Sequence, residues 1–410
     1  MNIKREEIKE LIRLNVQGAD RPGVTAALSK VLAEHNVDIL DIGQATIHND
    51  LGLGILFGLS AKNDSSAVLK DLLFKGYELG LNVKFTPIPL DEYEDWVSHQ
   101  GKERNIITLI GRNLTGIHLS KVTSIISEQG LNIDKITRIS GRRHLSDDNN
   151  TVMSVIEFSV RGIPCDEDKL KKDFLQVSKD TGIDLAFQED NIYRRNRRLV
   201  CFDMDSTLIQ AEVIDELARC AGVYDKVAAI TESAMRGEID FKESFTKRVA
   251  LLKGLDVSVM KDIAENLPLT DGAERLFRTL KKYGYKTAIL SGGFNYFGNY
   301  LKSKLGIDYV FANELEVEDG KLTGRYVGEI VDGAKKADYL KLLAFKEDLH
   351  LEQCIAVGDG SNDLPMIQLA GLGIAFHAKP KVKANAQHAI SENGLDTILY
   401  MIGFRDREIN

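Results

Sequence analysis

The sequence predicts an α/β chain in which two ferredoxin-like α+β units precede a larger domain built on a parallel sheet. Two observations lead to this fold class. Elements in the order β-α-β-β-α-β occur near the N-terminus and again in the second quarter of the chain. Beyond them, apolar strands alternate with helical stretches, which is typical of parallel βαβ units with helices on both faces of the sheet.

The repeated unit combines a strand, a Gly-x-[Asp/Asn]-x-x-Gly loop and a helix, at residues 12–35 and again at residues 106–129. We predict that the first unit spans residues 10–90 and the second residues 104–192. The polar segment 91–103 contains the only tryptophan and is interpreted as a linker.

The glycine loops suggest a ligand site, because glycine allows close backbone approach and a helix N-terminus offers free N–H groups to a carboxylate. The same residues also suit ordinary turns. The doubled unit resembles tandem ACT domains, small modules that bind amino acids at domain interfaces. The resemblance implies a homodimer and an amino-acid effector, with L-serine as the expected one, at Asp20, Gly23, Asn113 and Gly116. In the alternative interpretation the repeats serve only assembly or stability.

Composition argues against several classes of partner. The formal net charge is −8, so a nucleic acid duplex or an anionic membrane surface would on average be repelled. The arginines Arg194, Arg195, Arg197 and Arg198 are the local exception and are interpreted as a solvated connector. The apolar stretch 51–61 is too short to span a bilayer, and the N-terminus lacks the apolar block of a signal peptide. We therefore expect a cytoplasmic protein.

The larger domain is predicted over residues 198–410, with its first core strand at residues 199–202. The segment before the next core strand is far longer than one crossover helix needs, so we predict a helical cap over about residues 215–268. Residues 314–330 alternate on both sides of an Asp-Gly pair, which indicates a β-hairpin.

Polar residues follow three of the predicted core strands. Asp203 and Asp205 follow the first, Ser291 the second and Asp359 the fourth, while Lys336 begins a helix after the hairpin. Because the carboxyl ends of parallel strands meet at one edge, these side chains should share a pocket. Clustered carboxylates need a cation, and all-oxygen ligation favours Mg²⁺. A carboxylate can accept a phosphoryl group, so Asp203, attached directly to the strand, is the expected nucleophile.

These motifs resemble the haloacid dehalogenase (HAD) superfamily, whose Rossmann-like domain carries DxDx[TV], a Ser or Thr, a Lys and Gly-Asp-x-x-x-Asp in that order. The resemblance implies the following roles: Asp203 as nucleophile and metal ligand, Asp205 as general acid and base with its backbone carbonyl on the metal, Asp359 as metal ligand, Asp363 as support of the metal shell, and Ser291, Gly292 and Lys336 as phosphate ligands. The spacing from Asp332 favours Lys336 over Lys335. Asp363 also suits a plain helix N-cap, since Pro365 follows it closely.

Within the superfamily the match narrows to the phosphoserine phosphatase family, on the segments Phe202–Thr207, Ser291–Phe294 and Gly358–Met366, in which Ser361 replaces a commoner alanine. This resemblance implies hydrolysis of O-phospho-L-serine, the last step of serine biosynthesis, through an aspartyl-phosphate intermediate. It also implies a set of substrate contacts: Glu212 to the ammonium, Arg248 to the carboxylate, Met235 and Phe241 as apolar cap residues, and Asn362.

Two other functions stay open at this point. A phosphotransferase that passes the phosphoryl group to another alcohol, such as homoserine, would carry nearly the same motifs. A non-catalytic ligand sensor would not need Asp203, Asp205, Lys336 and Asp359 together, which argues against it.

Overall fold

The computed structural model describes residues 8–98, 101, 103–142, 144, 146, 153–236 and 238–409. The chain divides into two compact units, Met1–Lys102 and Glu103–Asn410, and each is described by itself. None of the helices among the described residues combines the length and the apolarity that crossing a membrane requires.

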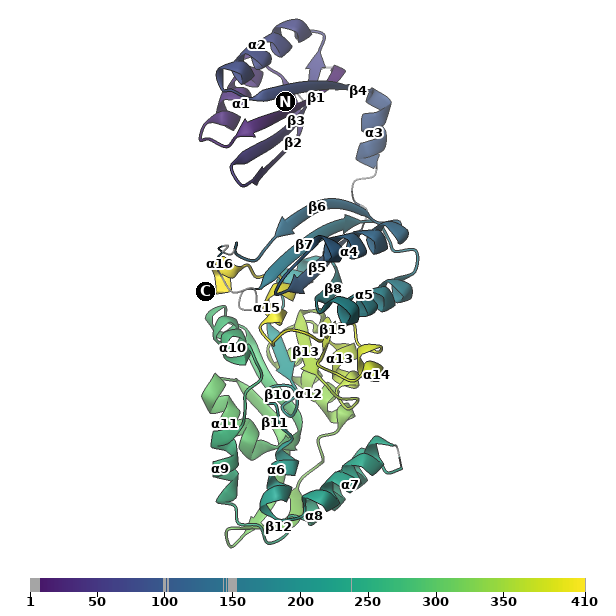
Figure 1. Cartoon of the computed structure of the whole chain (residues 1–410), viewed down its shortest axis with the longest axis vertical. Coiled ribbons are helices and arrows are strands. Elements are labelled where there is room, and N and C mark those ends of the chain that lie inside the picture. Colours follow the sequence, from purple (N-terminus) through teal and green to yellow (C-terminus); the bar gives the residue numbers. More distant parts are fainter. Residues whose placement is uncertain are drawn as a thin grey trace. The chain divides into compact units, whose positions relative to one another are not determined.

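The first unit is a ferredoxin-like α+β fold (Figure 1). Its elements are β1 (Ile8–Ala19), α1 (Val24–Glu34), β2 (Asp38–Ile47), β3 (Asp50–Ser60), α2 (Ser65–Glu78) and β4 (Asn82–Ile88). The antiparallel sheet has the order β2-β3-β1-β4. Buried and exposed residues largely alternate along β1, because the two helices cover one face of the sheet.

A short helix, α3 (Leu90–Ser98), follows β4 inside the segment that the sequence predicts to be a linker. It begins with the acidic residues Asp91 and Glu92, which suit the positive end of a helix dipole. None of its residues is buried. The segment is therefore helical without packing into a core.

The second unit begins with another ferredoxin-like fold. Its elements are β5 (Arg104–Gly111), α4 (Gly116–Glu128), β6 (Asn132–Arg138), β7 (Ser154–Arg161), α5 (Glu167–Thr181) and β8 (Asp184–Glu189). The strand order β6-β7-β5-β8 matches that of the first fold. The predicted repeat of two ferredoxin-like folds is confirmed.

This second fold shares a core with the parallel-sheet domain. Seven consecutive residues of β5 are buried, so both faces of the strand are covered, in contrast to β1. Ile110 and Val155 belong to the same apolar cluster as residues of the large sheet. The buried carboxylate of Asp184 accepts hydrogen bonds from the backbone N–H groups of Ser391 and Asn393, at 2.7 and 3.1 Å. The two parts are thus joined by apolar packing and by a buried polar clamp.

The large domain is built on a seven-stranded sheet of order β12-β11-β10-β9-β13-β14-β15. Its strands are β9 (Leu199–Phe202), β10 (Lys286–Phe294), β11 (Tyr309–Glu318), β12 (Lys321–Val327), β13 (Cys354–Gly358), β14 (Leu372–Phe376) and β15 (His388–Ile390). Its helices are η1 (Ile192–Arg195), α10 (Ala273–Lys282), α11 (Asn295–Leu305), α12 (Gly333–Lys346), η2 (Leu351–Gln353), α13 (Leu364–Leu369), α14 (Pro380–Lys383), α15 (Thr397–Met401) and α16 (Asp406–Ile409). All neighbouring strands are parallel except β11 and β12, so the predicted parallel-sheet class is confirmed.

Helices cover both faces of this sheet, which is why β9 is apolar throughout. Leu199 and Cys201 pack with residues of α12 and α13, whereas Val200 and Phe202 pack with residues of α10 and α11. The predicted hairpin turns at Asp319 and is formed by β12 and the end of β11. β15 was not predicted.

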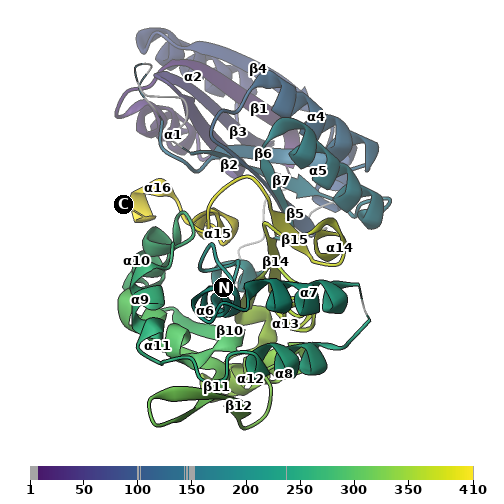
Figure 2. The ribbon, with the colours of Figure 1, turned by 60° about the horizontal axis from the view of Figure 1, so that its bottom comes forward.

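The predicted cap consists of four helices between β9 and β10, namely α6 (Val213–Cys220), α7 (Tyr224–Met235), α8 (Phe241–Ala250) and α9 (Val259–Asn266). Figure 2 shows α6, α7 and α8 in front of the sheet. The side chain of Phe245 anchors α8, because it is buried against the rings of Phe294 and Tyr326.

The arginine run was interpreted as a solvated connector, and this is wrong for two of its members. Arg194 is fully buried and pairs with Glu157, and Arg197 is 5% exposed. Arg197 donates to the backbone oxygens of Arg194 and Gly371. The run therefore ties the second ferredoxin-like fold to the large sheet, with only Arg195 and Arg198 facing outward in part.

Candidate active site

The site lies where β9, β10 and β13 end side by side. Asp203 follows β9 directly and is 5% exposed. Its backbone N–H donates to the carbonyl oxygen of Val357 at 2.9 Å, so the pairing of β9 with β13 continues to this residue. The backbone pairing of the sheet therefore holds Asp203 in a fixed position.

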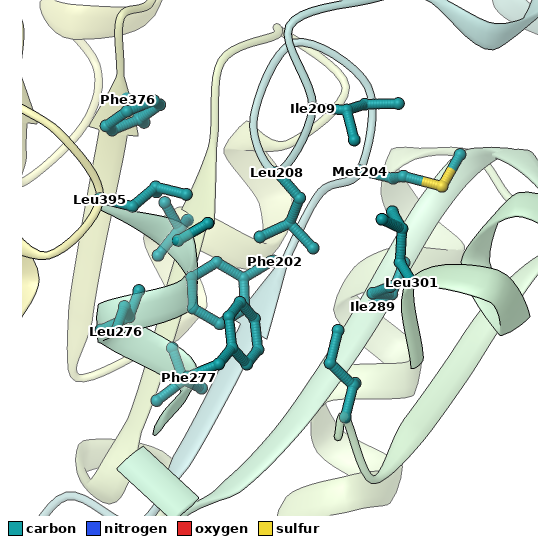
Figure 3. Close-up of a cluster of buried hydrophobic side chains, with 14 of the residues drawn as sticks. Phe202, Met204, Leu208, Ile209, Leu276, Phe277, Ile289, Leu301, Phe376 and Leu395 are labelled. Carbon is teal, nitrogen blue, oxygen red and sulfur yellow. The ribbon is translucent and has the colours of Figure 1, made fainter. Parts of the chain in front are cut away.

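An apolar cluster supports the loop that follows Asp203. Figure 3 shows Met204, Leu208 and Ile209 of this loop above Phe202 and Phe277. The two phenylalanine rings lie 5.0 Å apart between centroids. Because packed side chains resist displacement, the polar residues between these apolar positions are held in place.

Lys336 is buried between two of the aspartates. It lies in the first turn of α12, whose N-cap Asp332 accepts from the N–H of Lys335. The Lys336 Nζ atom is 2.9 Å from Asp203 Oδ1 and 2.6 Å from Asp363 Oδ1. Burial alone would lower the pKa of this ammonium, but the two carboxylates outweigh it and raise the pKa. Lys335 instead pairs with Glu329 outside the site.

Three carboxylates meet beside this lysine. One oxygen from each of Asp203, Asp359 and Asp363 lies within 4.8 Å of the other two. Burial, followed by the charge of Asp203, raises the pKa of Asp359 to about 8 and that of Asp363 to about 7. This repulsion and the all-oxygen donor set fit a hard divalent cation. Thr207 also belongs to the site, since its Oγ1 donates to Asp359 Oδ1 at 3.2 Å; it is the last residue of the DxDxT motif but was given no role.

Asp363 takes the N-cap position of α13, but its side chain makes no capping hydrogen bond to that helix. One oxygen binds Lys336, and the other accepts from the N–H of Gly360 at 2.9 Å. A Cβ atom on Gly358 would lie 2.4 Å from the Asp363 carboxyl carbon, so glycine is required there. Asp363 therefore serves the site rather than the helix.

Asp205 lies apart from this cluster. Its Oδ1 accepts from the backbone N–H of Val213, at the start of α6, at 3.1 Å. Burial, with the charges of Glu212 and Asp203, raises its pKa well above the usual value of a carboxyl group. The raised pKa favours the protonated form, in which this carboxyl group can donate a proton.

The last residues of β10, which follow Ile289 and Leu290, offer a second set of polar groups. Ser291 is fully buried, and its Oγ accepts from the N–H of Gly293 at 2.9 Å. Asn313, from β11, donates to the carbonyl oxygen of Gly292 and accepts from the N–H of Val331, both at 2.8 Å. No local sequence pattern indicates Asn313, because β11 pairs with the end of β10 only in the folded sheet.

The cap contributes residues that face the same edge. A Cβ atom on Gly292 would lie 2.9 Å from Phe241 Cζ, so α8 packs directly on the end of β10. Glu212 accepts from Ser206 Oγ at 2.8 Å, and burial raises its pKa. Burial lowers the pKa of Arg248, while the charge of Glu212 opposes that shift. Among the described residues, the hydrogen bonds of Arg248 are long, at 3.4 Å to the backbone oxygen of Ser244 and 3.5 Å to Thr231 Oγ1.

Two of the remaining predicted residues need separate mention. The Oδ1 atom of Asn362 folds back over Gly360, where a Cβ atom would lie 2.2 Å away, so Asn362 lies in the loop that carries the aspartates. Met235 ends α7, and its side chain lies outside the described residues.

The two predicted effector loops differ. Asp20 and Gly23 line a cavity of about 380 Å³ at the start of α1, where Gly23 is the N-cap, with φ +94°, and no side chain caps the helix. In the second loop, Gly116 begins α4, which has a capping box formed by Thr115 and His118. Asn113 lies in this second loop, whose neighbouring Arg112 contacts Asp271 of the large domain at 3.5 Å.

Comparison with protein families supports three modules. The haloacid dehalogenase-like hydrolase family matches residues 200–368, and ACT domain families match residues 10–86 and 104–188.

Proteins similar over nearly the full length are phosphoserine phosphatases. One from Streptomyces coelicolor is 38% identical over 97% of this chain and 93% of its own length. Another, from Mycobacterium tuberculosis, is 39% identical over 98% of this chain and 95% of its own. Among solved structures, an unliganded probable phosphoserine phosphatase from Vibrio cholerae covers 74% of this chain and 87% of its own, with a TM-score of 0.58 and 35% identity.

The raised pKa values predict how Mg²⁺ stabilises the protein at different pH. A carboxyl group whose pKa is raised by folding favours the folded state at low pH, and this contribution is lost as the pH rises through about 7 and 8. Mg²⁺ needs the ionised groups and relieves their repulsion. The increase in Tm caused by saturating Mg²⁺ should therefore be larger at about pH 8.5 than at about pH 6.

Thermal unfolding with Mg²⁺ and with excess chelator measures this difference. Asp359→Asn should remove most of the Mg²⁺-induced increase at both pH values. Equal increases in the wild-type protein at both pH values would contradict the role of these carboxylates.

Proposed function

The chain belongs to the phosphoserine phosphatases, HAD hydrolases that here carry two ACT domains, and on this premise we propose that it hydrolyses O-phospho-L-serine through an aspartyl-phosphate on Asp203. The observation that carries the proposal is the pair of unlike carboxyl groups. The Lys336 ammonium lies 2.9 Å from Asp203, whereas burial, with the charges of Glu212 and Asp203, raises the pKa of Asp205 well above its usual value. One aspartate is therefore suited to attack and the other to donate a proton.

In the first step, a carboxylate oxygen of Asp203 forms a bond to phosphorus, and the bond from phosphorus to the serine oxygen breaks. The carboxyl proton of Asp205 goes to that serine oxygen, so L-serine leaves as a neutral alcohol. Ser291, the backbone N–H groups that follow it and Lys336 would hold the phosphate oxygens. They would stabilise the negative charge that shifts among these oxygens during the transfer.

In the second step, the Asp205 carboxylate accepts a proton from water while the water oxygen forms a bond to phosphorus. The bond between phosphorus and the Asp203 oxygen breaks, inorganic phosphate leaves, and both aspartates return to their initial forms. The same group thus serves as acid and then as base.

Asp203, Asp359 and the backbone carbonyl of Asp205 would hold the Mg²⁺ ion, with Asp363 supporting them. When bound, Mg²⁺ neutralises charge on the phosphate and on the clustered carboxylates. Asp363 also orients Lys336 through their contact at 2.6 Å.

The amino-acid part of the substrate would lie between Glu212 and Arg248. Glu212 suits the ammonium, and Arg248 suits the carboxylate because a guanidinium binds it through two parallel hydrogen bonds. Arg248 is half-buried and Glu212 is exposed, and the described residues show no ion pair between the two. Phe241, and Met235 on the helix before it, would close the apolar side of the pocket.

The nucleophile is tested by Asp203→Asn, which should reduce phosphate release from O-phospho-L-serine to background. An amide is not a competent phosphoryl acceptor, and it is nearly isosteric with the carboxylate. Phosphate release, Tm and intact mass are measured together, so that deamidation back to aspartate is detected. Activity well above background without deamidation would rule out Asp203 as nucleophile.

The same assay with added homoserine separates hydrolysis from phosphotransfer. For a hydrolase, the amounts of phosphate and L-serine released stay equal. A deficit of phosphate, matched by phosphohomoserine, would assign the alternative activity instead.

The substrate contact is tested by Arg248→Ala, which should lower kcat/KM for O-phospho-L-serine by about 10- to 100-fold, the range expected for hydrogen bonds to a charged group. The loss should be much smaller for p-nitrophenyl phosphate, which has no carboxylate. Lys247→Ala, on the same helix but pairing with Glu243 in solvent, is the matched control. Equal losses for both substrates would assign Arg248 to structure or to phosphate binding.

We also propose that the first ACT domain binds L-serine as a feedback effector, within a homodimer. The cavity at Gly23 offers free N–H groups of α1 to a carboxylate and Asp20 to an ammonium. The second loop is the weaker candidate, because α4 is capped and Arg112 contacts the large domain.

Calorimetric titration of the full chain carrying Arg248→Ala, which weakens product binding at the active site, should still detect L-serine. Adding Asp20→Ala should weaken this binding, whereas adding Asn113→Ala should not. Light scattering gives the oligomeric state of each variant. An unchanged affinity for L-serine after Asp20→Ala would contradict the placement of the effector site in this cavity.

A further inference from the structure

A second cavity lies between the second ACT domain and the catalytic sheet. It has a volume of about 270 Å³ and is open to solvent on one side. Residues of α5 and β8 form one wall, and the segment from Lys383 to Ala389 forms the other. The wall from the ACT domain is apolar in part, with Phe174 and Leu185. The cavity therefore belongs to neither domain alone.

The charges around this cavity are unbalanced. Three lysines, Lys171, Lys172 and Lys383, line it against one aspartate, Asp168, which forms no ion pair among the described residues. Lys171 pairs with a carboxylate outside the lining, and Lys383 donates to a serine hydroxyl. No carboxylate within the described part of the chain pairs with Lys172. An anion in the cavity would reduce the repulsion among these ammonium groups.

A histidine on the catalytic side completes the lining. The His388 imidazole has no hydrogen-bond partner among the described residues, although it is partly buried. Burial, with the charges of Arg197 and Lys171, lowers its pKa to about 3. The ring is therefore neutral at physiological pH, and its N–H is available to an acceptor in the cavity.

We propose that this cavity binds a small organic anion, a carboxylate or phosphate monoester with a short apolar body. The anionic group would lie near Lys172 and Lys383, within reach of His388, and the apolar body would cover Phe174 and Leu185. This combination of an apolar wall with a few polar groups is typical of a small-molecule site at a domain boundary. The proposal is independent of the phosphatase mechanism and of the L-serine site.

Binding here would strengthen the contact between the two domains. Ser391, whose hydroxyl accepts from Lys383, also donates its backbone N–H to the buried Asp184 at 2.7 Å. β15 follows the cavity and pairs with β14, the neighbour of β13 that leads to Asp359. A ligand that bridges the domains should therefore raise the Tm of the full chain by mass action.

The probe is 4-fluorophenylacetate, which combines a carboxylate with an apolar ring, and the protein is the full chain with Mg²⁺. Fluorine NMR and calorimetry measure its affinity, and 4-fluorophenylacetamide serves as the neutral isostere. We expect binding of the acid at least about tenfold tighter than that of the amide, since a charge-assisted contact contributes on this scale. The Tm should rise with the acid only.

Two variants locate the site. The double variant Lys172→Gln, Lys383→Gln should weaken binding of the acid at least about tenfold. The control double variant Lys179→Gln, Lys381→Gln lies on the same two helices but outside the cavity lining, and it should leave the affinity unchanged. Ala384→Trp adds bulk at an exposed position of the lining and should abolish binding without lowering Tm.

Three results would overturn the proposal: no binding of the acid to the wild-type chain, equal affinity for acid and amide, or undiminished binding to Ala384→Trp. Phosphatase activity of each variant is measured in parallel. A variant that loses activity but still binds the probe would contradict the proposed function and leave the proposed anion site intact.

Discussion

The ammonium of Lys336 has no contact with solvent and lies between Asp203 and Asp363. Three carboxylates within 4.8 Å of one another would not all ionise without positive charge beside them. The lysine supplies part of that charge permanently, and a divalent cation would supply the rest. Removing one partner of such a buried pair typically costs about 3–5 kcal/mol, because an uncompensated charge remains. The fold itself therefore places a permanent positive charge beside Asp203.

This constraint explains why the surrounding loops are so restricted. Asp363 can reach Lys336 only because Gly358 has no side chain, and Gly292 leaves room for the ring of Phe241. Asn313 then fixes the carbonyl oxygen of Gly292 from a neighbouring strand. Gly358, Gly292 and Asn313 lie in strands of one sheet, whose spacing is set by backbone hydrogen bonds. A charge arrangement that tolerates little movement thus rests on the most rigid part of the chain.

The arrangement of the site could be anticipated from sequence where it depends on strand ends. Parallel strands meet at one edge, so Asp203, Ser291 and Asp359 had to converge once their strands were recognised. Asn313 could not be found in this way, because its role depends on the pairing of β11 with β10 and not on any local pattern. The burial of Arg194 and Arg197 could not be predicted for a related reason. A run of charged residues has the same composition whether it faces water or a second domain.

The first strands of the two ferredoxin-like folds differ in their sequence pattern. Residues 106–110 are apolar at nearly every position, whereas residues 12–16 alternate between apolar and polar. A strand that is apolar on both faces needs cover on both faces, and the large domain provides the second cover for β5.

The two ACT domains share a strand order but have different surroundings. In the second ACT domain, one sheet face packs against the catalytic domain in a shared core, and Asp184 and Arg112 also contact that domain. The first keeps one sheet face free within its own unit, and its α1 begins with no side-chain cap beside a cavity. Because a buried interface resists rearrangement more than an exposed loop does, the second domain is held firmly, whereas the loop before α1 in the first domain stays exposed. Duplication of one fold has thus produced two domains that differ in which surfaces each copy has buried.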